Sequence, residues 1–404
     1  MPYNSSLSLI SRAFTAICLS AIFFSCAHKS DKEVAVNLPS IDWNEEFPYQ
    51  KLDLPEIADI SYIPLETNDS CLIGLIGNIT IGDSLIAVAD LKQKAVFIFD
   101  RQGQYLSKVS RRGEGPEEYP FLSNTAVDLR NKEIFVYSLA GNKIYKYNLD
   151  GKFIDKFELA QPGKYENFYN YDDSTLIAHD YANLMIRQDG EENEPYRYVT
   201  INKTTGAVTK LPLRIDNPIG NSMQWKGDTY IRKVQITAYP LVADNSRTIA
   251  LDLSSDTIFD ISGGVCTPLV TMTNVDRSRQ IPDIVTIKAA LGKYLFLEYI
   301  RILDVTPDNV EFDQTKGYSY IYDLSTGELK KYDASFPFLT DKTYHRDINN
   351  QSVQAPSGIY CRPLSLEMLL KYLENDNLED PLKSIVEKAD PESNPILMIA
   401  KFKD

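Results

Sequence analysis

The stretch VFIFDRQGQYLSKV at residues 96–109 alternates apolar and polar side chains on both sides of a central Asp-Arg-Gln-Gly. A period of two is typical of β-strands that bury one face, and Asp and Gly supply the chemistry of a tight turn. The stretch therefore predicts a β-hairpin. Four similar stretches follow it, at residues 144–157, 198–211, 257–270 and 320–333.

The five stretches recur at a nearly regular interval. Their turn residues are 48, 54, 58 and 63 positions apart, and these residues are Asp100, Asn148, Asn202, Asp260 and Asp323. Further strand candidates lie between them, at 84–90, 132–138, 174–180, 247–253 and 293–305. Four strands in about 50–60 residues are typical of one blade of a β-propeller, and blades stack radially because one blade cannot bury both of its faces.

Five hairpins are visible, but we expect six blades. The segments ISYIPLE (60–66) and PILMIAKFK (395–403) each predict a strand that has no hairpin motif of its own. If the two ends of the chain pair in one shared blade, the ring closes and the last open edges are covered. Rings of five or seven blades are the alternatives.

One region predicts helices instead of strands. In SLEMLLKYLEN (365–375), apolar residues at every third or fourth position fall on one helical face. Asp380 and Pro381 then predict the start of a second short helix, because Asp caps helix N-termini and Pro fits the first helical position. The chain is therefore expected to be all-β, a six-bladed β-propeller with two short helices near the C-terminus.

The first two repeats carry a sharper resemblance. The stretches 98–119 and 126–153 resemble NHL repeats, in which a glycine-rich loop such as GEGP (113–116) precedes an inner strand. Together with the opening ISYIPLET and the closing NPILMIAKFK, they resemble a family of six-bladed propeller lipoproteins of Gram-negative gut bacteria. The resemblance covers nearly the whole chain and implies the fold and a place in the cell envelope, but it implies no particular biochemical activity.

The N-terminus predicts export and attachment to a membrane. An apolar stretch at 13–24 follows Arg12, the only charge before it, and is shorter than the roughly 20 residues that span a bilayer. The ending Phe-Phe-Ser-Cys resembles a bacterial lipobox, which implies cleavage before Cys26 and acylation of its thiol. We therefore expect a signal peptide (1–25), a lipidated polar tether (26–45) and a propeller (46–404), held on the outer membrane and facing the periplasm or the cell surface. An ordinary signal peptide is the alternative.

The charge balance limits the possible partners. The formal net charge is −14 and no run rich in Lys or Arg is present. An acidic surface repels phosphate backbones, so nucleic acid is not an expected partner. Anionic lipid headgroups are poor partners for the same reason, and membrane attachment would depend on the lipid at Cys26.

Catalytic signatures are scarce. The sequence contains no GxSxG, HExxH, Walker or GxGxxG motif. His179 and His345 are the only histidines of the expected propeller, too few for the zinc site of an amidating lyase with NHL-type blades. No cofactor or metal is therefore expected. The alternative is a calcium-dependent hydrolase or lactonase, which three or more carboxylate or amide oxygens converging in the channel would favour.

The connections between blades predict a binding face. In a propeller, the loops that join the outer strand of one blade to the inner strand of the next lie on one face. These loops are rich in aromatic residues, Arg and Asn, and comprise 111–121, 163–171, 215–225 and 274–283. Aromatic rings stack on sugars and Arg binds carboxylates. We therefore predict that this face binds a glycan, a small acidic ligand or a protein partner through Arg112, Tyr119, Phe168, Trp225 and Arg279.

Each of these residues also has a structural interpretation. Aromatic side chains such as Phe168 could fill the core along the inner strands, and Arg112 could pair with a neighbouring glutamate such as Glu114. Trp225 is one of only two tryptophans, and the other, Trp43, lies in the expected tether.

Overall fold

The computed structural model describes residues 38–403 except for 162, 182–194, 237, 316, 336–343 and 346–347. Residues 38–404 form one compact unit. The predicted signal peptide, Cys26 and the first part of the predicted tether lie outside the described residues.

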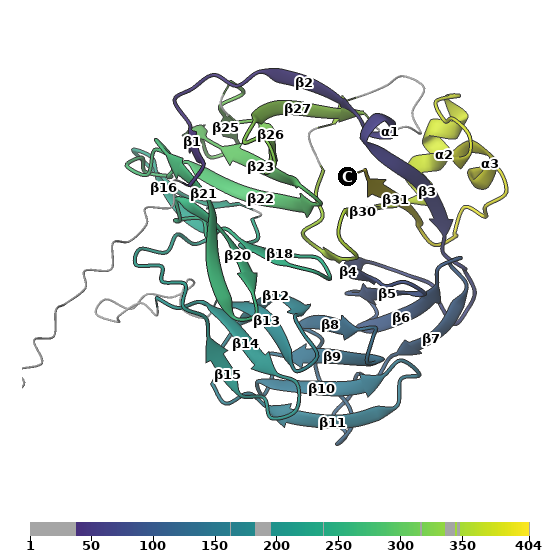
Figure 1. Ribbon diagram of the computed structural model, residues 1–404. Coiled ribbons are helices and arrows are strands. Elements are labelled where there is room, and N and C mark those ends of the chain that lie inside the picture. The colour runs from purple at the N-terminus through teal and green to yellow at the C-terminus, as the bar shows by residue number, and fades with distance from the viewer. Residues whose placement is uncertain are drawn as a thin grey trace, which may run out of the picture. The chain divides into compact units, whose positions relative to one another are not determined.

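Six β-sheets surround a central axis as the blades of a propeller (Figure 1). Blades 1 and 2 comprise β4 (Ile76–Ile81), β5 (Leu85–Asp90), β6 (Ala95–Asp100) and β7 (Tyr105–Val109), then β8 (Asn124–Asp128), β9 (Glu133–Ser138), β10 (Lys143–Asn148) and β11 (Phe153–Glu158). Blades 3 and 4 comprise β12 (Tyr165–Asn170), β13 (Thr175–Asp180), β14 (Tyr198–Asn202) and β15 (Val208–Lys210), then β18 (Leu241–Ala243), β19 (Thr248–Ala250), β20 (Thr257–Ser262) and β21 (Val265–Thr273). Blade 5 comprises β22 (Ile284–Leu291), β23 (Tyr294–Ile300), β26 (Ser319–Asp323) and β27 (Leu329–Ser335), with β28 (Tyr344–His345) paired to β27.

The five predicted hairpins are confirmed as the third and fourth strands of blades 1–5. The middle strands are buried on both faces, because each blade packs against two neighbours. The turn glycine of the first hairpin shows why its residue type matters. Gly103 has φ +85°, and a Cβ there would lie 2.1 Å from the carbonyl oxygen of Pro64 in the neighbouring blade.

Blade 6 is built from both ends of the chain, as predicted. Strand β3 (Ala58–Pro64) pairs antiparallel with β31 (Ile396–Phe402) along its full length. Strand β31 pairs on its other side with β30 (Ile359–Leu364), so the C-terminal strand is the middle strand of this three-stranded blade. The ring is therefore closed by hydrogen bonds between the two ends of the chain.

The expected boundary between tether and propeller at residue 45 is wrong. Strand β1 (Ser40–Asp42) pairs in parallel with the outer strand of blade 4, and β2 (Tyr49–Asp53) pairs in parallel with the outer strand of blade 5. Trp43 is only 3% exposed, and its ring centroid lies 4.8 Å from that of Tyr299. The N-terminal segment belongs to the fold because it satisfies the edges of two outer strands.

The two predicted helices are present between β30 and β31 and lie beside blade 6 (Figure 1). They are α2 (Leu366–Glu374) and α3 (Leu382–Val386), and a third, four-residue helix, α1 (Leu54–Ile57), was not predicted. Ser365 caps α2, since its hydroxyl accepts the Met368 N–H at 3.3 Å. Asp380 accepts the Ser384 N–H at 3.1 Å. Within the described part of the chain, no helix combines the length and apolar character needed to cross a bilayer.

The segment 348–355, termed the channel segment, crosses the centre of the ring. It includes β29 (Val353–Gln354), which pairs in parallel with β4. Its hydrogen bonds reach five blades. They join Ser352 O to Ile79 N, Ala355 O to Asn245 N, Asn350 N to Lys288 O, Gln351 O to the Tyr169 hydroxyl and the side-chain oxygen of Asn350 to Cys361 N. Contacts with so many inner strands place the segment in the channel, where it separates one mouth from the other.

Candidate functional site

The two faces of the propeller are named by their connections. The linker face carries the connections from one blade to the next, on which the predicted binding site depends. The turn face carries the tight turns that join the first strand of each blade to the second. The channel segment lies between the two.

Two of the five predicted binding residues are core residues. Tyr119 is fully buried, and its hydroxyl donates to the carbonyl of Lys94 at 2.5 Å. Phe168 is 2% exposed and packs against Tyr137, with 6.0 Å between ring centroids. Neither ring is therefore presented on the surface as predicted, because the space between neighbouring blades takes up both aromatic side chains.

Trp225 and Arg279 lie close to one small apolar cluster on the linker face. Hairpins β16–β17 (Ser222–Lys226 and Ile231–Gln235) and β24–β25 (Ile302–Val305 and Val310–Phe312) bury apolar side chains against each other, and Trp225 packs against this cluster. Arg279 donates to the carbonyl of Ile302. Both side chains thus contribute to holding the inserted hairpins in place.

Arg112 is exposed on a different connection, the one between blades 1 and 2. Of the five predicted residues, only Phe168 lines any of the cavities described below. The structure therefore does not gather the five residues into one pocket.

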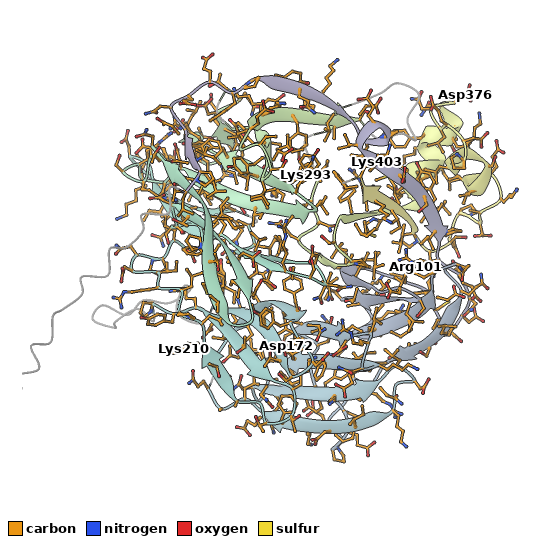
Figure 2. All side chains as sticks on the ribbon, in the orientation of Figure 1. Arg101, Asp172, Lys210, Lys293, Asp376 and Lys403 are labelled. Carbon is orange, nitrogen blue, oxygen red and sulfur yellow. The ribbon has the colours of Figure 1, made fainter. Side chains whose placement is uncertain are left out.

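A hollow lies on the opposite face, the turn face. This wide mouth has a volume of about 490 Å³ and is formed by the first turns of blades 1–4 together with the channel segment. Its polar side chains include Asp83, Ser84, Asp128, Arg130, Asn170, Asp172, Asp173, Asn245 and Gln354. Asp172, which is labelled in Figure 2, marks the contribution of blade 3.

The floor of the wide mouth is polar and fixed. Gln354 of the channel segment accepts the Asn170 N–H at 3.1 Å and donates to the Asn170 carbonyl, as a neighbouring strand would. Asn245 donates to the carbonyl of Ile81 at 3.3 Å. The side-chain oxygen of Asn170 is buried and has no hydrogen-bond partner among the described residues, which leaves an acceptor available at the floor.

The wide mouth is acidic. Asp128 is buried and accepts from the Lys203 ammonium at 2.6 Å. Burial would raise the pKa of Asp128, but hydrogen bonds from Asn131 and Lys203 outweigh burial and hold its pKa below the usual value. The pKa of Asp172 is likewise lowered, because N–H and hydroxyl groups of Ser174 and Thr175 in its own turn outweigh the effect of burial. Both carboxylates are thus ionised at neutral pH.

A second hollow of about 410 Å³ lies beside blade 5 and reaches the inserted hairpin β24–β25. Lys288 and Glu298 form an ion pair of 2.8 Å there, and Phe312 and Tyr318 add aromatic surface. This groove combines cationic and aromatic side chains as the sequence led us to expect, although none of the five predicted residues lines it.

The carboxylates of the wide mouth are spread over separate turns. Across the described ranges, no three His, Cys, Asp or Glu side chains are grouped so that they could hold a metal ion. The calcium-dependent alternative stays a prediction, as does the absence of a cofactor.

The sequence contains a signal for the wide mouth that was missed. Asp83-Ser84, Asp173-Ser174 and Asn245-Ser246 each follow an inner strand and occupy the same turn in three different blades. Taken singly, such pairs are ordinary turn formers. Their repetition becomes visible only when the sequences of the blades are aligned according to the structure, because the three pairs then fall at one position.

Comparison with known proteins identifies the family. Residues 38–401 match the model described as a domain of unknown function, DUF4934. The chain belongs to the DUF4934 family. No curated protein matches this DUF4934 chain.

Two crystal structures share the fold of the DUF4934 chain. A Bacteroides fragilis protein presumed to be exported aligns with a TM-score of 0.60 at 16% identity, covering 91% of this chain and 99% of its own. A DUF4221 family member from Bacteroides vulgatus aligns with a TM-score of 0.51 at 10% identity, covering 86% and 98%. At these identities the similarity concerns the fold alone.

Proposed function

We propose that this DUF4934 protein is a lipid-anchored binding protein of the cell envelope that takes a small, hydroxyl-rich ligand, such as a glycan fragment, in its wide mouth. The observation that carries the proposal is the 490 Å³ hollow, to which four blades contribute polar side chains. Ligand sites for small molecules span roughly 300–1,000 Å³.

The chemistry of the lining favours sugar hydroxyls. A hydroxyl both donates and accepts, so it can pair with carboxylates such as Asp83 and with the unpartnered oxygen of Asn170. The floor is held by hydrogen bonds between Gln354 and the backbone of Asn170, so its polar groups are positioned before a ligand arrives. The surplus of carboxylates argues for a neutral or positively charged ligand.

Variants of the wide mouth test this site. Once a ligand is found by glycan-array and thermal-shift screening, Asp83→Ala and Asn170→Ala should each weaken binding about tenfold, the typical effect of losing one good polar contact. Isothermal titration of each variant measures the change, and the melting temperature checks that the fold is retained. Arg112→Ala, on the linker face, is the matched control and should bind normally. If both mouth variants bind normally and Arg112→Ala loses binding, the ligand binds on the linker face and the proposal is wrong.

The place in the envelope is supported by the N-terminus and by the exported relative from Bacteroides fragilis. Cleavage before Cys26 leaves a short tether, since the fold begins at residue 38. The propeller would then stand close to the outer membrane, on its periplasmic or its outer side.

Removal of the thiol tests the anchor. Intact mass of membrane-extracted protein should show an N-terminal acylated Cys26, and Cys26→Ala should shift the protein from the membrane fraction to the soluble fraction. Ser25→Thr, which leaves the thiol in place, is a control for handling of the signal peptide. A wild-type protein that is soluble and begins at another residue would contradict lipidation.

A further inference from the structure

The narrow mouth on the linker face holds a separate small cavity. It has a volume of about 160 Å³ and lies where the inner strands of blades 1–3 meet the channel segment. Its lining contains no Asp, Glu, Lys, Arg or His. The polar side chains around it include Asn78, Thr125, Asn167, Tyr239, Gln351 and Ser352.

Two buried amide oxygens of this cavity lack a donor. Asn167 is 8% exposed and Gln351 is 2% exposed, and the side-chain oxygen of each has no hydrogen-bond partner within the part of the chain described. They come from different elements, Asn167 from β12 and Gln351 from the channel segment. Buried acceptors without donors are costly, and native structures keep them where a ligand or water completes them.

The backbone at Asn167 adopts a strained conformation. Its φ is +48°, and it lies at an irregularity of the β12–β13 pairing between Glu166 and Tyr169. The other described non-glycine residues with positive φ lie in turns or loops, whereas Asn167 lies within an inner strand. Strain of this kind is concentrated at ligand sites, where a bulge alters the course of a strand and the aim of its side chains.

We propose that the narrow mouth binds the ammonium group of a small amine. An ammonium group donates three hydrogen bonds, which matches a cavity whose unsatisfied groups are acceptors. A single positive charge costs less to bury than the double charge of a divalent cation, and the two unpartnered amide oxygens of this cavity would repel an anion. The cavity has about a third of the volume of the wide mouth, so it admits only a small molecule.

Methylammonium chloride is the probe, titrated into the mature protein at constant ionic strength with tetramethylammonium chloride as the balancing salt. Tetramethylammonium carries the same charge but no N–H donor. Methylammonium should raise the melting temperature saturably, and Asn167→Gly, which retains the left-handed backbone and removes the amide, should weaken its binding about tenfold or more.

Two matched variants make the result specific. Asn142→Gly removes another left-handed asparagine whose side-chain oxygen is buried without a partner, but away from the cavity, and should leave the response unchanged. Asp83→Ala removes a carboxylate of the wide mouth and should also leave it unchanged. The proposal is overturned by a wild-type protein that does not respond, by K⁺ or Na⁺ acting as well as methylammonium, or by Asn167→Gly responding like wild type. A loss of response in Asp83→Ala would instead assign the amine to the acidic wide mouth.

Discussion

Deletion of residues 395–404 is expected to abolish the native fold rather than weaken it. The deleted strand β31 is the middle strand of blade 6, so its loss leaves both β3 and β30 without partners. Leu397, Met398 and Ala400 are fully buried, and removing one large core side chain alone costs about 2–5 kcal/mol. We expect the truncated chain to aggregate, because the deletion exposes two strand edges and opens the core of blade 6. Size-exclusion chromatography and circular dichroism of the truncated chain measure the outcome.

Point substitutions in the same strand provide a control. Met398→Asp places a charge in the core of blade 6 and should prevent folding, because a buried carboxylate without a partner is strongly unfavourable. Lys401→Gln alters an exposed position of the same strand, opposite Asp59, without adding a negative charge, and should leave the melting temperature nearly unchanged. A truncated chain that remains monomeric and melts like the full chain would contradict closure of the ring by β31.

Lys203→Met is expected to destabilise the fold by about 3–5 kcal/mol, since it leaves the buried Asp128 carboxylate without its charged partner. Lys203 also donates to the carbonyl of Asp172, so the turn of blade 3 would loosen as well. Urea denaturation at pH 7 measures the loss. Lys371→Met breaks an exposed ion pair of 2.8 Å and should change stability little.

The pH dependence distinguishes the charge effect from a loss of packing. In the wild type the pKa of Asp128 is lowered by folding, so its contribution is present above the pKa of the unfolded chain and is lost as the pH falls through the lowered value. Without Lys203, burial should raise the pKa of Asp128, and the variant should lose less stability than the wild type on acidification. The difference in the free energy of unfolding between wild type and Lys203→Met should therefore become smaller at low pH. Adding Asp128→Asn to Lys203→Met should recover part of the lost stability at pH 7. A gap that does not change with pH would indicate that packing alone is lost.

The sequence predicts the blades well because their signal is local. In the alternating stretch 96–109 and in each of its four repeats, the residues pair within one hairpin. The shared sixth blade is predicted because two apolar strands, one near each end of the chain, have no hairpin partner of their own. Strand β1 escapes prediction because three residues added to an outer edge show no alternation. The channel segment is polar in sequence, and only the ring around it makes it a buried strand.

The site was harder to predict because burial depends on neighbouring blades. Tyr119 is part of a glycine-rich connection that resembles an exposed binding loop, yet its ring lies between Tyr145 and Tyr147 in the core. Residues such as Asp172 resemble plain turn formers and become candidate ligand contacts because four turns surround one mouth. Charge and residue type can be derived from the sequence, but the face on which they gather depends on the closed ring.

Hydrogen–deuterium exchange of the mature protein, with and without a glycan ligand from the screen, tests the central claim most directly. The proposal predicts slower exchange in peptides that contain the first turns of blades 1 and 3, residues 82–84 and 171–173, and in the channel segment near Gln354. Peptides on the linker face, around Arg112 and Trp225, should exchange as in the free protein. Protection confined to the linker face, with the turn-face peptides unchanged, would contradict the assignment of the wide mouth as the binding site.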